Sequence, residues 1–238
     1  MKTFGLIGKS LSHSFSERYF NKKFYKEEIT NAEYINFEIN DISKFTDLIK
    51  TQNISGLNIT IPYKESIIPF LDELSKDAKS IGAVNTIQFK DNKLIGHNTD
   101  IIGFRESILP ILGGRKSALI LGDGGAAKAI KLGLRQLNIS FRIATRESSF
   151  KYSDISTQDI DYHDIIINTT PLGMYPNTEN YPKIPYEKLT EKHLLFDLIY
   201  NPSETLFLKH GRAKKSKIKN GLNMLKIQAE ASWSIWNN

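Results

Sequence analysis

The 238-residue sequence contains no cysteine. Disulfides, thiol nucleophiles and thiolate metal sites are therefore excluded, and the cytoplasm is the expected compartment. No uninterrupted apolar run is long enough to span a bilayer, and Met1 to Gly8 lead into polar residues rather than into the apolar core of a signal peptide. Internal repeats and low-complexity tracts are also absent from the sequence. We therefore expect a cytoplasmic protein without a metal site or a membrane partner.

Dense charge of one sign is scarce as well. The formal net charge of +6 raises the possibility of a nucleic-acid partner. Lys and Arg are nevertheless spread along the chain, and the one dense run, Arg212 to Lys219, has no interleaved aromatic residues for base stacking. We interpret this run as a solvated surface segment and expect no nucleic-acid partner. A hydrophobic fraction of 40% over this length predicts one large or two small globular domains.

The most informative stretch that is present runs from Ser117 to Ile130, where an apolar run breaks into glycines and resumes at helical spacing. Gly122, Gly124 and Ala127 fit the glycine fingerprint of a dinucleotide-binding unit. The first glycine permits a tight turn, the second lets the backbone approach a pyrophosphate, and the alanine lets the helix pack on the strand. Because a strand precedes the motif and a helix follows it, the pattern favours a cofactor site over a purely structural turn.

The next strand, Ser140 to Thr145, indicates which dinucleotide would bind. An NAD site usually places an acidic residue at this strand end, about 20 positions after the glycines, to hold the ribose 2′-hydroxyl. Here the chain offers Thr145, Arg146 and Glu147. A guanidinium pairs well with a 2′-phosphate, whereas the neighbouring carboxylate would repel it. We predict NADP rather than NAD, and the alternative for Arg146 is a solvated loop charge.

Polar side chains also alternate along the segment Ser55 to Lys64. Leu57, Ile59 and Ile61 are expected to point to one face, and Asn58 and Thr60 to the other. Pro62 ends the pairing, which places Lys64 at the start of a following helix, near the carboxyl end of the strand where ligands bind in open α/β sheets. The alternative is a half-exposed edge strand.

The remaining pattern predicts two domains that meet near residue 100. In the first we expect strands at Phe4–Gly8 and Tyr34–Ile39, a helix after the serine-rich loop with an apolar stripe of Tyr19, Phe20, Phe24 and Tyr25, a helix at Ile42–Ile49, and a hairpin of residues 82–89 and 93–97 around Asp91–Asn92. In the second we expect a helix at Ile101–Leu112, strands at Asp164–Ile167 and Leu194–Tyr200, a helix starting at Asn201–Ser203, and a last helix that opens at Gly221.

Eight short motifs occur in a specific order: Ser-Leu-Ser-His-Ser-Phe-Ser, Asn-Ile-Thr-Ile-Pro-Tyr-Lys, Gly-Ala-Val-Asn-Thr, Asn-Thr-Asp, Gly-Asp-Gly-Gly-Ala-Ala, Asn-Thr-Thr-Pro-Leu-Gly-Met, Asp-Leu-Ile-Tyr-Asn-Pro and Gly-Leu-Asn-Met-Leu. In this order the chain resembles the shikimate dehydrogenase family over essentially its whole length. The resemblance implies NADPH-dependent reduction of 3-dehydroshikimate to shikimate, in the route to chorismate and the aromatic amino acids. It further implies a two-domain α/β enzyme, a monomer or homodimer. An N-terminal substrate domain with a mainly parallel sheet (1–100, completed by the C-terminal helix 221–238) would precede a Rossmann NADP-binding domain (101–220).

The resemblance also assigns roles by position. Lys64 and Asp100 match the catalytic pair. The substrate-binding positions are Ser14, Ser16, Asn58, Thr60, Lys64, Asn85, Asp100, Tyr200 and Gln228. The cofactor-binding positions are Gly122, Asp123, Gly124, Gly125, Ala126, Ala127, Thr145, Arg146, Thr169, Leu198, Gly221 and Met224. In the implied reaction the Lys64 ammonium donates a proton to the carbonyl oxygen that receives the hydride, and Asp100 orients the reacting hydroxyl and the lysine.

This chain departs from the family pattern at several positions. It has Glu17 where proline usually follows the second serine, Asp123 where the glycine turn usually has alanine, and Thr-Arg-Glu where the family usually reads Asn-Arg-Thr. The segment between Arg146 and Asp164 is also short. Three alternatives therefore stay open: a quinate/shikimate dehydrogenase that uses NAD or NADP, an enzyme similar to methylenetetrahydrofolate dehydrogenase, and a non-catalytic dinucleotide-binding module.

Overall fold

The chain divides into two compact units, which we call unit 1 (Met1–Thr99 and Ala229–Asn238) and unit 2 (Asp100–Gln228). The computed structural model describes residues 1–12, 14–147 and 149–238, so His13 of the serine-rich motif lies outside the described residues. The last helix, α8 (Leu222–Trp236), begins in unit 2 and ends in unit 1, whereas the family resemblance implied that residues 221–238 complete the first domain. No helix of the described residues is long and apolar enough to cross a membrane.

Unit 1 is built on a mixed sheet of six strands in the order β2-β1-β3-β5-β6-β4. Its strands are β1 (Lys2–Gly8), β2 (Ala32–Glu38), β3 (Ile54–Ile59), β4 (Glu73–Leu74), β5 (Thr86–Lys90) and β6 (Lys93–His97). The strands β2, β1 and β3 are parallel, and β5 and β6 form the predicted antiparallel hairpin. Asp91 and Asn92 have φ angles of 51° and 58°, the left-handed conformations that such a tight turn requires.

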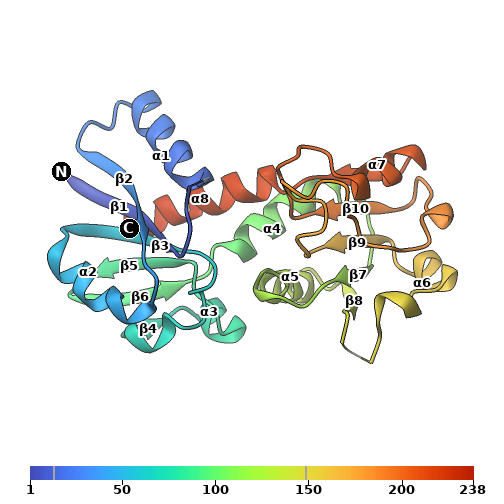
Figure 1. Cartoon of the computed structure of the whole chain (residues 1–238), viewed down its shortest axis with the longest axis horizontal. Coiled ribbons are helices and arrows are strands. Elements are labelled where there is room, and N and C mark those ends of the chain that lie inside the picture. Colours follow the sequence, from blue (N-terminus) through green and yellow to red (C-terminus); the bar gives the residue numbers. More distant parts are fainter. Residues whose placement is uncertain (13, 148) are drawn as a thin grey trace. The chain divides into compact units, whose positions relative to one another are not determined.

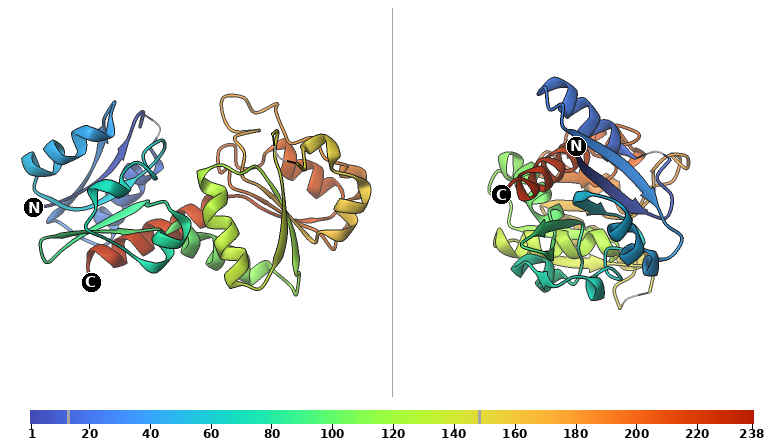
Figure 2. Two further views of the ribbon diagram at one scale, coloured as in Figure 1. Left: turned by 90° about the horizontal axis from the view of Figure 1, so that it is seen from below. Right: turned by 90° about the vertical axis from the view of Figure 1, so that its left-hand side faces the viewer.

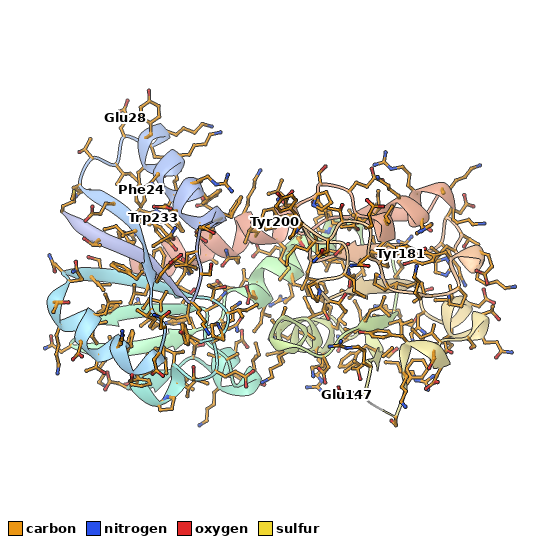
Figure 3. The ribbon with its side chains drawn as sticks, in the orientation of Figure 1. Phe24, Glu28, Glu147, Tyr181, Tyr200 and Trp233 are labelled. Atoms are coloured by element: carbon orange, nitrogen blue, oxygen red, sulfur yellow. The ribbon has the colours of Figure 1, made fainter. Side chains whose placement is uncertain are left out.

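The helices of unit 1 cover both faces of this sheet (Figure 1). They are α1 (Phe15–Lys26), η1 (Ile42–Lys44), α2 (Phe45–Thr51), η2 (Ile68–Phe70) and α3 (Lys76–Ile81), together with the end of α8. Phe45 and Ala78, from α2 and α3, pack with Leu57 and Ile59 on one face. On the other face α1 and α8 pack together, and Figure 3 shows Phe24 beside Trp233, with ring centroids 5.3 Å apart.

Unit 2 contains a sheet of five parallel strands in the order β11-β10-β9-β7-β8. The strands are β7 (Ser117–Leu121), β8 (Ser140–Ala144), β9 (Ile165–Asn168), β10 (Leu194–Asp197) and β11 (Lys217–Lys219). In a doubly wound sheet of this order, ligands bind outside the carboxyl ends of the strands where the winding reverses. That point lies between β7 and β9. The predicted α/β class and Rossmann-type architecture are thus confirmed.

Helices lie on both faces of the unit 2 sheet, as Figure 2 shows. They are α4 (Asp100–Ile108), η3 (Leu109–Ile111), α5 (Gly125–Gln136), η4 (Tyr152–Asp154), α6 (Thr157–Tyr162), η5 (Tyr186–Lys188) and α7 (Leu206–Ala213), together with the start of α8. Successive residues of β7 serve opposite faces: Ile120 packs with Phe104 of α4, whereas Leu119 packs with Phe207 of α7. This alternation buries every residue of the strand.

Four local expectations are wrong. Tyr25 is 86% exposed, because it lies outside the α1 stripe formed by Phe20 and Phe24. Ile61 is 78% exposed, because β3 ends at Ile59 and the alternation stops there. No helix begins at Lys64, which lies in a series of turns. No helix begins at residues 201–203 either.

The helix expected at residues 201–203 starts instead at Leu206, where the Thr205 hydroxyl accepts a hydrogen bond from the Leu208 N–H (3.4 Å) and caps α7. The basic run 212–219 is largely exposed, as expected, with only Ser216 buried, but it is not a simple loop. Its first residues end α7, whereas Lys217–Lys219 form the edge strand β11, which pairs with β10.

Candidate active site

The serine-rich loop ends as the N-terminus of α1. Ser14 is the N-cap, and its hydroxyl oxygen accepts a hydrogen bond from the Glu17 N–H (3.3 Å). The Ser16 hydroxyl is hydrogen-bonded to the phenol of Tyr34 on β2, and burial is the main cause that raises the pKa of this phenol. Both serines are half-buried. A capped helix start with two hydroxyls suits an anionic ligand group, because the helix dipole and O–H donors both favour negative charge there.

Asn58 lies at the centre of a buried polar network in unit 1. Its side-chain oxygen accepts a hydrogen bond from the Tyr34 hydroxyl (2.8 Å). Its amide nitrogen lies 3.2 Å from the Thr86 hydroxyl, 3.0 Å from the Ser232 hydroxyl and 3.1 Å from the Asn85 carbonyl oxygen. The side chain is 5% exposed. Asn58 therefore braces β2, β3, β5 and α8 from inside, while its expected contact with substrate stays a prediction.

Asn85 anchors the chain just before α4. Its side-chain oxygen accepts a hydrogen bond from the Thr99 backbone N–H (2.7 Å), and Asp100 is the next residue. The neighbouring Val84 N–H donates to the backbone carbonyl oxygen of Lys64 (2.7 Å). Two adjacent residues of the Gly-Ala-Val-Asn-Thr motif thus fix the backbone at Lys64 and immediately before Asp100. Both predicted catalytic side chains are half-buried.

Thr60 follows β3 and is half-buried, in line with its position beyond the last paired residue. Its backbone N–H donates to the Ile7 carbonyl oxygen (2.9 Å), which holds the segment at the carboxyl end of β1. Ser14, Ser16, Thr60, Lys64 and Asn85 thus all belong to unit 1, and the polar network links Ser16 to Asn58 and Asn85.

The glycine turn of unit 2 has the geometry that a dinucleotide requires. Gly122 has a φ of +105°, and a Cβ at this position would lie 2.8 Å from the Thr169 hydroxyl and 2.9 Å from the Thr170 methyl group. Only glycine therefore fits where the ends of β7 and β9 meet. Gly124 caps the 12-residue helix α5, and neither it nor Gly125 has any heavy atom within 4 Å of an added Cβ. The open space before the N–H groups of α5 fits a pyrophosphate.

One of the two charged departures from the family pattern in unit 2 has a local explanation. Asp123 is exposed, and its carboxylate pairs with the Lys131 ammonium of α5 at 2.6 Å, which offsets the negative charge beside the turn. After β8, the Thr145 hydroxyl accepts a hydrogen bond from the Glu147 N–H (3.2 Å). Arg146 is exposed, and its positive charge partly opposes the burial that raises the pKa of Tyr152. An exposed guanidinium beside a hydroxyl at this strand end could hold a 2′-phosphate.

Leu198 and Gly221, both predicted near the cofactor, lie against each other. A Cβ at Gly221 would overlap the Leu198 carbonyl oxygen, so only glycine permits this approach. Met224 is 9% exposed and belongs to the apolar cluster around Phe104, and its cofactor contact stays a prediction. Tyr200, labelled in Figure 3, is half-buried in the loop after β10, whereas Gln228 is 7% exposed on α8.

The buried carboxylate of Asp197 was not singled out by the sequence analysis. It accepts hydrogen bonds from the Asn168 amide (3.1 Å), the Ile199 N–H (3.0 Å) and the Thr205 hydroxyl (2.6 Å). Burial raises the pKa of Asp197 to about 6. These bonds tie the loop that begins with Thr169 to the loop that carries Leu198 and Tyr200. The signal that could have revealed it is a lone acidic residue at the end of an otherwise apolar strand.

Comparison with known proteins decides the family. The family model described as the shikimate dehydrogenase substrate binding domain matches residues 6–87. The NADP(+)-dependent shikimate dehydrogenase of Methanocaldococcus jannaschii is 39% identical, over 99% of this chain and 91% of its own length. This chain belongs to the shikimate dehydrogenase family.

Solved shikimate dehydrogenase structures agree with the fold. A crystal structure of a shikimate dehydrogenase in complex with NADP+ has a TM-score of 0.90 and 39% sequence identity, covering 99% of this chain and 90% of that one. The Thermus thermophilus enzyme, solved with NADP(H) and shikimate, has a TM-score of 0.87 and 27% identity, covering 99% and 93%. The recognition of a shikimate dehydrogenase from its eight motifs is thus confirmed.

Proposed function

We propose that this chain catalyses the NADPH-dependent reduction of 3-dehydroshikimate to shikimate, in the route to chorismate and the aromatic amino acids. The observation that supports it most directly is the pair of anchors at Val84 and Asn85. They fix the backbone at Lys64 and at Thr99, which precedes Asp100. A proton donor and a hydroxyl-orienting carboxylate need such fixed backbones, because a misplacement of about 1 Å costs about 100-fold in rate.

Most of the residues that would hold the substrate belong to unit 1, whereas Asp100, Tyr200 and Gln228 belong to unit 2. Ser14 and Ser16 would donate hydrogen bonds to its carboxylate, Thr60 and Asn85 would bind ring hydroxyls, and Tyr200 and Gln228 would complete the site. The Lys64 ammonium would donate a proton to the carbonyl oxygen as negative charge develops there, and in the reverse direction the amine would accept it. Asp100 would accept a hydrogen bond from the reacting hydroxyl and keep it oriented.

The residues of unit 2 would hold the dinucleotide. The N–H groups of Gly124, Gly125 and Ala126 would bind the pyrophosphate, and Thr145 and Arg146 would bind the 2′-phosphate. When bound, NADPH supplies the hydride that reduces the ketone. The loops after β9 and β10, which contain Thr169 and Leu198, would line the nicotinamide end.

The absence of cysteine supports a cytoplasmic location, and we propose a monomer or homodimer.

The direct test follows the absorbance of NADPH while the purified protein is mixed with 3-dehydroshikimate. We expect turnover by the wild-type protein and a loss of about 10²- to 10⁴-fold in kcat for Lys64→Ala, with KM changed little, because general acid catalysis contributes that much. Lys79→Ala, which removes an exposed lysine from α3 of the same unit, is the control and should keep full activity.

Two of the alternatives are separated by further measurements of cofactor binding and of the oxidation of quinate and shikimate. NADPH binding without turnover of any tested acid would indicate a non-catalytic binding module. Faster oxidation of quinate than of shikimate with NAD+ or NADP+ would indicate a quinate dehydrogenase. Near-normal turnover by Lys64→Ala would refute the role of this lysine while leaving the activity intact.

A further inference from the structure

The residue after Ser16 has two contacts that a proline could not make. The Glu17 N–H donates to the Ser14 hydroxyl oxygen (3.3 Å), and proline has no N–H at this position. The Glu17 carboxylate accepts a hydrogen bond from the Asn36 amide nitrogen of β2 at 2.6 Å. In the first contact the Ser14 hydroxyl oxygen is the acceptor, so its hydrogen can still be donated to another group. The second fixes a negative charge one residue from the proposed carboxylate-binding serine.

The surroundings of Glu17 place this charge on the same side of unit 1 as the serines. Ser16 is hydrogen-bonded to Tyr34. Burial is the main cause that raises the pKa of the Tyr34 phenol, and the negative charge of Glu17 raises it further, so Glu17 lies close enough to interact with this phenol. Tyr34 and Asn36 alternate with Ile35 on β2 and therefore share a face of the sheet. The side-chain oxygen of Asn36 is buried and has no hydrogen-bond partner among the described residues. The Glu17 carboxylate and the side-chain oxygen of Asn36 are thus hydrogen-bond acceptors on the side of unit 1 where the two serines are proposed to bind an anion.

We propose that Glu17 is a specificity-determining residue that lowers the affinity of the proposed substrate site for carboxylates. Its charge, held in place by Asn36, repels the substrate carboxylate at Ser14 and Ser16. It also occupies the first turn of α1, where it already offsets the positive end of the helix dipole that would otherwise attract the substrate. This inference rests on the proposed function, because it requires that a carboxylate bind at the two serines.

The test is the variant Glu17→Gln, which keeps the N–H and an oxygen that can accept from Asn36 but removes the charge. We expect the KM for 3-dehydroshikimate to fall about three- to tenfold with kcat unchanged, because a half-exposed charge interacts at this level. The KM for the neutral methyl ester of the substrate should not change. The gain should shrink as ionic strength rises, because salt screens the repulsion.

Glu27→Gln is the matched control. It removes the same charge from the other end of the same helix, about 15 Å away at 1.5 Å per residue, and should leave both KM values unchanged. An unchanged or higher KM for Glu17→Gln, or an equal change for acid and ester, would overturn the proposal.

Titration calorimetry with shikimate separates this proposal from the proposed function. A wild-type protein without turnover that binds shikimate more weakly than Glu17→Gln would refute the activity and support the role of Glu17. An active wild-type protein with the same dissociation constant as the variant would refute the role of Glu17 alone.

Discussion

The polar network of unit 1 and the glycine turn of unit 2 are two sites built in different ways. In unit 1 the residues expected to bind substrate are continuous with the core: Asn58 and Asn85 are 5% and 3% exposed, and their partners come from strands and from α8. In unit 2 the turn is defined by backbone, with Gly122 excluded from bearing a side chain and Gly124 facing open space. Side chains therefore determine the first site, and backbone shape determines the second.

The difference explains why two of the departures from the family pattern, those at Asp123 and Glu147 of unit 2, are tolerated by the fold. Asp123 and Glu147, which replace the usual residues of the cofactor site, are both exposed and touch no core cluster. Substitutions at exposed positions of this kind usually change stability by less than about 0.5 kcal/mol. A change inside the unit 1 network would instead leave buried polar groups without partners.

The largest expected effect is on stability, and it distinguishes a residue that supports folding, Asn58, from a nearby residue expected to bind substrate, Thr60. Asn58→Leu should lower the free energy of unfolding by about 3 to 5 kcal/mol, because Tyr34, Thr86 and Ser232 would lose a buried partner together. Thr60→Val, two residues later, should change stability by less than about 1 kcal/mol but raise the KM for 3-dehydroshikimate. Urea unfolding and steady-state kinetics measure the two effects. Equal stability changes for both variants would contradict the comparison.

Asp197 is the exception in unit 2, since it is a buried side chain that shapes the loops of the cofactor site. Because burial raises its pKa to about 6, the folded state binds its proton more tightly than the unfolded chain does, where the value is 3.8. Its contribution to stability is therefore complete below about pH 4 and is lost as the pH rises through about 6. The loss is about 3 kcal/mol, from a shift of about two pKa units.

Asp197→Asn isolates this contribution, because the amide does not titrate and the Thr205 hydroxyl can turn to accept from it. The unfolding free energy of the wild-type protein minus that of the variant should fall between pH 4 and pH 7. A difference that is constant with pH would show that the pKa of Asp197 is not raised. Denaturant unfolding over this range measures it.

Features specified by neighbouring residues were predictable from the sequence. The hairpin at Asp91–Asn92 and the glycine turn at Gly122 are set by residues that tolerate left-handed backbone, and both formed where expected. The sequence analysis assigned no helix or strand to the short segment between Arg146 and Asp164, which contains α6. This helix begins with a capping box, in which the side chains of Ser156 and Asp159 each accept a hydrogen bond from the other residue's backbone N–H. The spacing of these two residues in the sequence is a signal that could have predicted the helix.

Features that depend on distant partners were not predictable. The expected helix at Lys64 fails because the Lys64 carbonyl oxygen accepts the Val84 N–H, and the Ile68 N–H that a helix would direct there bonds to Glu65 instead. Asn58 looked like a ligand-binding residue in an alternating strand. Its burial became clear only from Ser232, which lies 174 residues away in the chain. No local propensity encodes such pairings.

The smallest expected effect is at Arg146, an exposed residue of unit 2, where we expect a change in affinity for NADPH without a change in folding. Arg146→Ala should raise the KM for NADPH about tenfold, the scale of one lost charge-assisted hydrogen bond, while the KM for NADH changes little because NADH lacks the 2′-phosphate. Lys151→Ala removes a positive charge from another exposed residue after β8 and serves as the control. Equal increases for both cofactors, or the same increase for Lys151→Ala, would mean that Arg146 acts only through general electrostatics. Unfolding by urea should not distinguish Arg146→Ala from the wild-type protein, because an exposed guanidinium outside the core contributes little to stability.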